Sequence, residues 1–141
     1  MLRLWNFTFV GILDHGPTIV AAIRSNVSDA MQLRADVSSL DGWTVVSLFG
    51  ELDVASAPNL REQLIQLVSQ GSHLLVLDLE GLDFLDSTGL GAIISALKRA
   101  RTNGGDLRLV CTQSRIRRLF EITALDKAFP LFTSLDAAVR A

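Results

Sequence analysis

Cysteine and histidine are scarce in this sequence of 141 residues, which holds one cysteine and two histidines. The single Cys111 cannot form an internal disulfide, and it stands in the apolar run LRLVC, where a thiol usually acts as a small core hydrophobe. His15 and His73 have no partner at the spacing of a metal site, and the sequence has neither an HExxH motif nor paired cysteines. We therefore expect no bound metal and a reducing, cytoplasmic location.

The sequence also lacks a strong excess of charge and a long apolar run. Its 13 lysines and arginines against 15 aspartates and glutamates leave a net charge of -2, so nothing favours a nucleic-acid partner. The one dense basic cluster, Arg115, Arg117 and Arg118, would spread over more than one helix face and fits a solvated surface better than a DNA contact. Polar residues and a proline interrupt the apolar N-terminal stretch before it reaches the length of a membrane span. Neither nucleic acid nor a membrane is an expected partner.

Residues 1–30 stand apart from the rest of the chain. The aromatic residues of WNFTF alternate with polar ones, which is the period of a half-buried strand. Three interpretations stay open: the segment adds an edge strand, it pairs with a second copy in a homodimer, or it is an extension ahead of a natural start at Met31. We therefore divide the chain into an N-terminal extension, residues 1–30, and one domain, residues 31–141.

Strand-like and helix-like segments alternate along residues 31–141. Apolar and β-branched runs predict strands. Apolar residues at helical spacing, each set preceded by a serine that suits a helix N-terminus, predict helices. The expected strands are 43–49, 73–79, 106–111 and a short edge or irregular strand near 129–133, and the expected helices begin at or follow Ser56, Ser87, Ser114 and Ser134. The strand 73–79 is apolar almost throughout, as a central strand covered on both faces would be. This alternation predicts right-handed crossovers and a largely parallel sheet with helices packed on it.

The hydroxyl and glycine motifs of the sequence match no common catalytic site. Leu85 stands where a G-x-S-x-G elbow around Ser87 would need its first glycine, so a serine hydrolase has little support. The stretch STGLGA lacks the lysine of a phosphate-binding loop and the spacing of a dinucleotide fingerprint. Asp78 lacks the acidic pair and the lysine of a response-regulator acceptor, which favours a structural or capping role. We expect a protein that is not an enzyme and that binds no cofactor of its own.

The stretch DSTGLG, residues 86–91, lies between an apolar strand and an apolar helix. Serine, threonine and aspartate are preferred helix caps, so the motif fits a cap and nothing more. It also fits a regulatory site, because free amides and the helix dipole favour an anion at a helix N-terminus. A phosphate on Ser87 would add a charge of about -1.5 to -2 beside Asp86 and near Asp83, and a partner fitted to the bare hydroxyl would meet repulsion. The motif alone leaves both interpretations open.

Three longer stretches carry a family resemblance. They are VVSLFGELDVASAPNLREQL, then LLVLDLEGLDFLDSTGLGAIISALKRARTNGGDLRLV, and last IRRLFEITALDKAFPLFTSLDAAV. Through them residues 31–141 resemble the STAS domain family, in particular the bacterial anti-sigma-factor antagonists. The resemblance implies an α/β STAS fold, with a mostly parallel or mixed sheet of about four or five strands and about four helices packed mainly on one side. It does not extend to residues 1–30.

The resemblance also implies a mechanism and a set of site residues. Ser87 matches the residue that a cognate anti-sigma factor, a serine kinase with its own bound ATP, phosphorylates. The residues that match the surrounding partner-binding surface are Gly50, Glu51, Leu52 and Asp53 in a neighbouring loop and Asp86, Thr88, Gly89 and Leu90 at the helix start. Unphosphorylated protein would bind the anti-sigma factor and free the sigma factor, phosphorylated protein would release it, and a phosphatase would reset the switch.

Two rival functions remain beside this switch. STAS domains also occur in stress-sensing assemblies, transporter tails and lipid-transport complexes, so the chain could be an interaction subunit or scaffold that is never phosphorylated. A transporter tail is disfavoured, because no transmembrane run accompanies the domain. A weaker rival is an enzyme that hydrolyses a small ester or phosphate at Ser87. A serine at position 87 with Asp86 before it favours the switch.

Overall fold

The computed structural model describes the backbone of residues 5–9, 21–25 and 33–141, and side chains from residue 33 onward. Its strands are β1 (Trp5–Phe9), β2 (Ala21–Ser25), β3 (Arg34–Leu40), β4 (Trp43–Leu52), β5 (Leu74–Leu85), β6 (Asp106–Val110) and β7 (Leu131–Phe132). Its helices are α1 (Ala57–Ser69), α2 (Ser87–Thr102), α3 (Ser114–Ile122) and α4 (Leu135–Arg140), with a 3-10 turn at Leu125–Lys127. In this part of the chain, no helix has the length and apolar character needed to cross a membrane.

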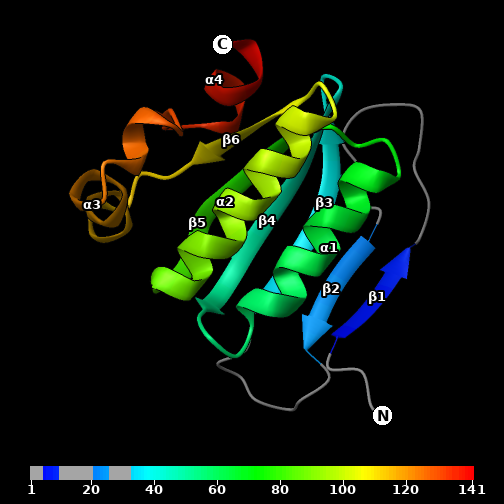
Figure 1. Cartoon of the computed structure of the whole chain (residues 1–141), viewed down its shortest axis with the longest axis horizontal. Helices are drawn as coiled ribbons and strands as arrows, with labels where there is room; N and C mark the ends of the chain where they lie inside the picture. Colours follow the sequence, from blue (N-terminus) through cyan, green and yellow to red (C-terminus); the bar gives the residue numbers. More distant parts are fainter. Residues whose placement is uncertain (1–4, 10–20, 26–32) are drawn as a thin grey trace.

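The strands lie in chain order, from β1 to β7, in one mixed sheet (Figure 1). The pairs from β1 to β4 are antiparallel, and the pairs from β4 to β7 are parallel. Strands β3 to β7 confirm the predicted α/β sheet of four or five strands, with β5 at its centre. The largely parallel sheet expected for residues 31–141 is confirmed, because β3–β4 is the one antiparallel pair among β3 to β7; β1 and β2, from the N-terminal extension, add two more antiparallel pairs.

Strand β3 lies outside the strands predicted from the sequence. It buries alternate side chains, among them Ala35 and Val37, and pairs with β4 through a two-residue connection. That connection is Asp41 and Gly42, whose φ angles are 51° and 84°. Asp-Gly is a favoured pair for such a tight turn, because both positions need positive φ. The dipeptide is therefore the sequence signal that identifies this hairpin.

Strands β4 and β5 run further than the sequence predicted. β4 continues through Leu52 instead of ending at Gly50, and β5 continues to Leu85, beyond the predicted range 73–79. Two register shifts in the second half of β4 keep the two strands paired along this extension. The extension brings the ends of both strands together, directly before the helices that follow them.

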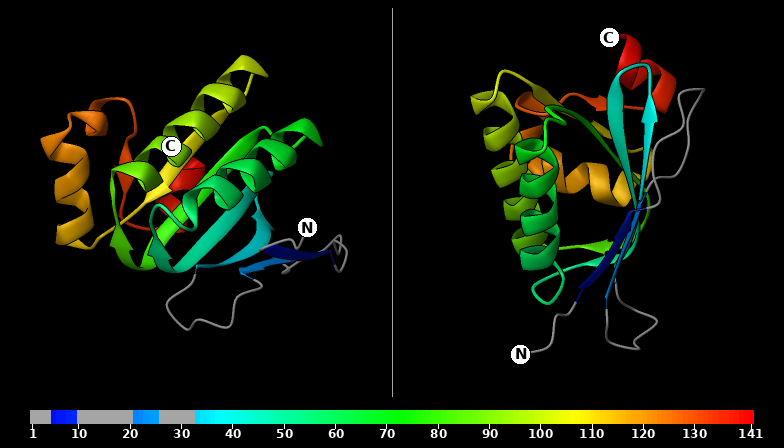
Figure 2. Two further views of the ribbon diagram at one scale, coloured as in Figure 1. Left: turned by 60° about the horizontal axis from the view of Figure 1, so that its bottom comes forward. Right: turned by 90° about the vertical axis from the view of Figure 1, so that its right-hand side faces the viewer.

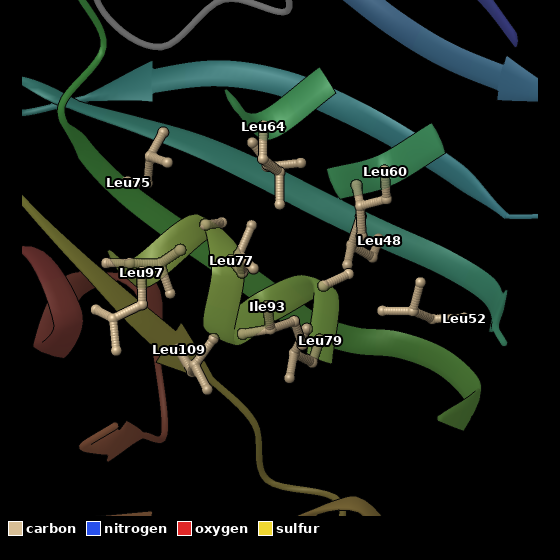
Figure 3. Close-up of a cluster of buried hydrophobic side chains, with 14 of the residues drawn as sticks. Leu48, Leu52, Leu60, Leu64, Leu75, Leu77, Leu79, Ile93, Leu97 and Leu109 are labelled. Carbon is tan, nitrogen blue, oxygen red and sulfur yellow. The ribbon is translucent and has the colours of Figure 1, made fainter. Parts of the chain in front are cut away.

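A large cluster of buried side chains fills the space between the sheet and helices α1, α2 and α3. Figure 3 shows Leu60 and Leu64 of α1, with Ile93 and Leu97 of α2, lying over leucines of β4, β5 and β6. The predicted apolar stripe of α1, from Leu60 to Val68, is buried as expected. Each such side chain contributes on the order of 1.5–3 kcal/mol by leaving water, so this layer fixes both helices on the sheet.

A smaller cluster lies on the opposite face of the sheet, where α4 packs. Trp43, Val45 and Val76 are buried there with Ala138 of α4. The Arg108 guanidinium lies 4.3 Å from the centre of the Trp43 ring and donates a hydrogen bond of 2.6 Å to the Ala138 carbonyl. The other face carries α1 and α2 side by side (Figure 2). The predicted packing of helices mainly on one side is therefore confirmed, with α4 as the exception.

Candidate functional site

Asp86 caps helix α2, so Ser87 is the first residue inside the helix. Asp86 has an extended backbone, and its Oδ1 accepts a hydrogen bond of 2.9 Å from the amide of Gly89. The amide of Leu90 donates to the Asp86 carbonyl at 3.0 Å, which closes the first helical turn. Because the carboxylate satisfies one of the free amides, the helix start does not need the Ser87 hydroxyl as a cap.

The side chains of Ser87 and Thr88 are exposed at the start of α2. Within the described residues neither hydroxyl makes a hydrogen bond, although the cap beside them is formed. α2 runs for 16 residues, so its N-terminus carries the positive end of a full helix dipole. The helix therefore presents two unengaged hydroxyls to solvent at a position that favours negative charge.

Gly89 brings the two predicted motifs into contact. A Cβ atom at this position would lie 2.7 Å from Cγ of Leu52 and 2.8 Å from the Leu52 carbonyl oxygen. The Asp86 amide also donates to that carbonyl at 3.3 Å. The absence of a side chain at Gly89 thus lets the first turn of α2 rest on the end of β4. Residues 50–53 and 86–90, far apart in the sequence, form one surface.

The predicted loop at 50–53 is wrong in its secondary structure. Gly50, Glu51 and Leu52 are the last residues of β4 and pair with β5, and only Asp53 lies in the turn that follows. The difference arises because β5 runs long enough to pair with them. Leu52 is fully buried, and Gly89 and Leu90 near it are buried, so these three residues form the packed layer beneath the surface. The other predicted residues reach solvent: Ser87 and Thr88 are exposed, and the half-buried ones are Gly50, Glu51, Asp53 and Asp86.

A hydrogen-bonded turn joins this strand end to α1. The Asp53 carboxylate accepts from the amides of Ala55 and Ser56, at 3.0 and 3.2 Å. The Ser56 hydroxyl donates to the Glu51 carbonyl at 2.9 Å and accepts from the Asp53 amide at 3.0 Å. Ser56 occupies the N-cap position of α1 but makes no side-chain cap bond, so the predicted capping role is wrong. Its buried hydroxyl instead holds the turn that positions Glu51 and Asp53.

The end of β5 is held from its other side by the segment before α3. The Gln113 side-chain amide donates to the carbonyls of Glu80 and Leu82, at 2.9 and 2.8 Å. Arg115, part of the predicted basic cluster, donates to the Asp83 carbonyl at 2.8 Å. These bonds fix the backbone that leads into Asp86 and Ser87, so the surface stands on a strand supported on both sides.

Two exposed apolar side chains flank the surface and were not predicted from the sequence. Val54, in the turn after β4, is 69% exposed, and Phe84, near the end of β5, is 46% exposed. Large apolar residues at such exposure beside a polar surface are typical of protein contacts. The sequence does not identify them as exposed, because a single Val or Phe next to apolar leucines is normally predicted to be a buried core residue.

Burial shifts the pKa of two side chains noted in the sequence, Cys111 and Asp78. Cys111 is buried, as predicted for a core thiol, and burial raises the pKa of this thiol. Burial also raises the pKa of the Asp78 carboxyl, against the opposing effect of a 3.0 Å hydrogen bond from the Glu80 amide. In the part of the chain that the structure describes, no group of three or more His, Cys, Asp or Glu side chains could hold a metal ion.

The fold and this surface together define a small α/β domain that presents a helix-start hydroxyl above the ends of two parallel strands. The model of the STAS domain family matches residues 34–138, and the chain belongs to that family. The chain is 36% identical over 110 residues to the anti-sigma-B factor antagonist of Bacillus subtilis (strain 168), a match that covers 78% of this chain and 100% of that relative.

Solved structures agree with this assignment. An anti-sigma factor antagonist from Mycobacterium paratuberculosis matches with a TM-score of 0.72 and 32% identity, over 81% of this chain and 97% of the other. The Bacillus cell fate determinant SpoIIAA in its phosphorylated form matches with a TM-score of 0.59 and 23% identity, over 73% of this chain and 95% of that one. At that identity, SpoIIAA shows a shared fold alone.

Proposed function

We propose that this chain is an anti-sigma-factor antagonist that is switched by phosphorylation of Ser87. The observation that carries the proposal is the exposed Ser87 hydroxyl, which has no hydrogen bond within the described residues while Asp86 alone caps the helix. The names of the relatives support it, since the Bacillus subtilis and Mycobacterium paratuberculosis proteins are both anti-sigma factor antagonists. The proposed partner is an anti-sigma factor that is also a serine kinase.

In the proposed reaction the chain supplies only the acceptor. The Ser87 oxygen attacks the γ-phosphorus of ATP held by the partner, the bond to ADP breaks, and the hydroxyl proton passes to a base of the partner. A phosphatase later transfers the phosphoryl group to water and restores the hydroxyl. The chain thus needs no cofactor and is not itself the enzyme. The helix dipole and free amides at the start of α2 favour the phosphate where it forms, so the helix is expected to persist.

The switch acts through the charge of the surface. Glu51, Asp53 and Asp86 reach solvent around Ser87, and a phosphate adds about -1.5 to -2 to this acidic group. A partner that fits the bare hydroxyl then meets repulsion and the cost of desolvating the phosphate. Each 1.4 kcal/mol lost from the complex is about a tenfold loss of affinity, so a few kcal/mol suffice to release the partner.

Binding measurements with three proteins test the proposal. Wild type, Ser87→Ala and Ser87→Asp are titrated against purified anti-sigma factors of the organism that encodes this chain. Wild type and Ser87→Ala are expected to bind one of them with similar affinity, and Ser87→Asp to bind it at least about tenfold more weakly because of its added charge. Equal affinity of all three would contradict the switch and favour an interaction subunit that is never phosphorylated.

A further inference from the structure

A groove of about 310 Å³ lies between α1 and α2 beside the proposed phosphoacceptor. The two helices run side by side over the sheet (Figure 1). Seven residues line the groove: Ala57, Pro58 and Arg61 from α1, and Thr88, Gly91, Ala92 and Ser95 from α2. Most of them are small, which leaves the space between the helices open. Thr88 belongs both to this groove and to the surface around Ser87, so the two are continuous.

Gly91 forms part of the groove without being needed by the chain's own fold. Apart from its chain neighbours and the nearby backbone of α2, no atom lies within 4 Å of a Cβ placed on Gly91, whereas a Cβ on Gly89 would collide with Leu52. Glycine is less favourable than alanine inside a helix, because it loses more backbone freedom on folding. Helical packing therefore explains Gly89 and does not explain Gly91. The space above Gly91 fits the close approach of a group from outside the chain.

Arg61 places a positive charge at the edge of the same groove. Its side chain is exposed, and it makes no ion pair or hydrogen bond with the residues that the structure describes. Among the other exposed arginines, Arg101 pairs with Asp106 and Arg140 pairs with Asp136, whereas Arg99 and Arg118 share with Arg61 the lack of a partner in the described residues. An arginine beside an apolar groove is suited to a carboxylate, which it can bind with two parallel hydrogen bonds.

We propose that this groove binds one segment of the anti-sigma factor, which places an aliphatic side chain over Gly91 and a carboxylate against Arg61. The inference rests on the proposed function, because a kinase that reaches the Ser87 hydroxyl must cover the first turn of α2, where the groove begins at Thr88. The charge of Arg61 selects an acidic segment, and the small residues select a slender apolar side chain. The groove then gives the partner a second binding site, which adjoins the phosphoacceptor but does not include it.

Filling the groove tests the apolar part of this proposal. Gly91→Met places a flexible side chain in the groove and replaces glycine with a better helix former, so thermal unfolding is expected at the same or a higher temperature. Affinity for the anti-sigma factor that binds wild type is expected to fall at least about tenfold. Gln66→Met is the matched control, because Gln66 is exposed on α1 outside the groove, and its affinity is expected to stay at the wild-type value.

Reversing the charge tests the polar part. Arg61→Glu is expected to weaken binding by about tenfold or more, and Arg61→Lys to retain most of the affinity, because a carboxylate on the partner would meet repulsion in the first case and attraction in the second. A further readout separates the groove from the phosphoacceptor. With the partner kinase in excess, Gly91→Met and Arg61→Glu are expected still to accept one phosphate on Ser87, because the hydroxyl and its cap are unchanged.

The outcomes distinguish this inference from the function on which it rests. Wild-type affinity of both groove variants, together with weak binding of Ser87→Asp, would overturn the groove and leave the phosphorylation switch standing. If none of the organism's anti-sigma factors binds wild type, the proposed function fails and the groove inference fails with it. Loss of binding in Gly91→Met together with unfolding at a lower temperature would indicate a damaged helix. The comparison of Arg61→Glu with Arg61→Lys then tests the groove: weaker binding of Arg61→Glu alone supports it, and equal affinity of the two overturns it.

Discussion

Gly89 lies directly against Leu52, so that a Cβ on the glycine would be 2.7 Å from Cγ of the leucine. This contact joins the first turn of α2 to the end of β4, and the Asp86 amide reinforces it by donating to the Leu52 carbonyl. The half-exposed Glu51 and Asp53 therefore lie in the same surface as the exposed Ser87 and Thr88. Any partner that covers Ser87 meets both motifs at once.

Replacing Gly89 with alanine is expected to destabilise the protein by about 1–3 kcal/mol, because the new methyl group must displace Leu52 or the helix. The measurement is the free energy of unfolding from a urea titration. Gly91→Ala is the matched control, since the space around Gly91 is open, and it is expected to stabilise by about 0.5–1 kcal/mol through helix propensity. Equal effects of the two substitutions would contradict the close packing of Gly89.

Removing the cap with Asp86→Ala is expected to cost about 0.5–2 kcal/mol of stability, because the Gly89 amide loses its acceptor. Asp86→Asn keeps a side-chain oxygen at the same place and is expected to lose much less. Urea unfolding of both variants checks the difference. A similar loss in the two would show that the charge of Asp86, and not the cap hydrogen bond, stabilises the helix start.

Ser56→Ala is expected to destabilise the folded protein by about 1–3 kcal/mol. The substitution removes the buried hydroxyl that bonds the Glu51 carbonyl and the Asp53 amide, and it leaves both groups without this partner. Ser69→Ala, an exposed position at the end of α1, is the control and is expected to have little effect. The turn also positions Glu51 and Asp53, so Ser56→Ala is expected to weaken partner binding as well. A stable Ser56→Ala protein would contradict the role assigned to this hydroxyl.

Asp78 gives a pH dependence whose sign follows from burial. Burial raises the pKa of its carboxyl in the folded protein above the ordinary 3.8, so the folded state holds this proton over a range of pH in which the unfolded state has lost it. Its contribution therefore lowers stability as the pH rises through that range. Asp78→Asn keeps the acceptor for the Glu80 amide and is expected to be more stable than wild type at neutral pH.

Urea titrations over a pH series check the Asp78 prediction. The advantage of Asp78→Asn over wild type is expected to be largest at neutral pH and to shrink as the pH falls toward 3.8, where wild type also carries a neutral carboxyl. Asp126→Asn, at an exposed position, serves as the control. An advantage that stays constant across the series would show that ionisation of Asp78 is not its cause.

The sequence predicted well the elements that depend on apolar periodicity. In the α1 stripe from Leu60 to Val68 and in the central strand β5, the apolar residues of the sequence are the ones that the fold buries. Strand β3 was missed, because only alternate residues of it are buried and its identifying turn, Asp41 with Gly42, is short. Periodicity reports burial, and it therefore predicts a half-buried strand less well than a covered one.

The sequence predicted which residues belong to the candidate site better than it predicted how they are arranged. The sequence places a helix start near Ser87, but which hydroxyl or carboxylate caps a helix depends on side-chain rotation, and here Asp86 caps α2 while Ser56 turns back to Glu51. The packing of Gly89 on Leu52 joins residues far apart in the chain, which spacing along the sequence does not reveal. The space left at Gly91 likewise becomes visible only once α1 and α2 lie side by side.

Site mapping of the phosphate tests the central claim most directly. The purified chain is incubated with ATP and the anti-sigma factor that binds it, with Ser87→Ala and Thr88→Ala in parallel, and each product is analysed by intact mass, peptide mapping and co-elution. We expect one phosphate on Ser87 in wild type and in Thr88→Ala, none in Ser87→Ala, and loss of co-elution only where the phosphate is present. A chain that stays unmodified while bound, or that gains its phosphate in Ser87→Ala, would contradict the account.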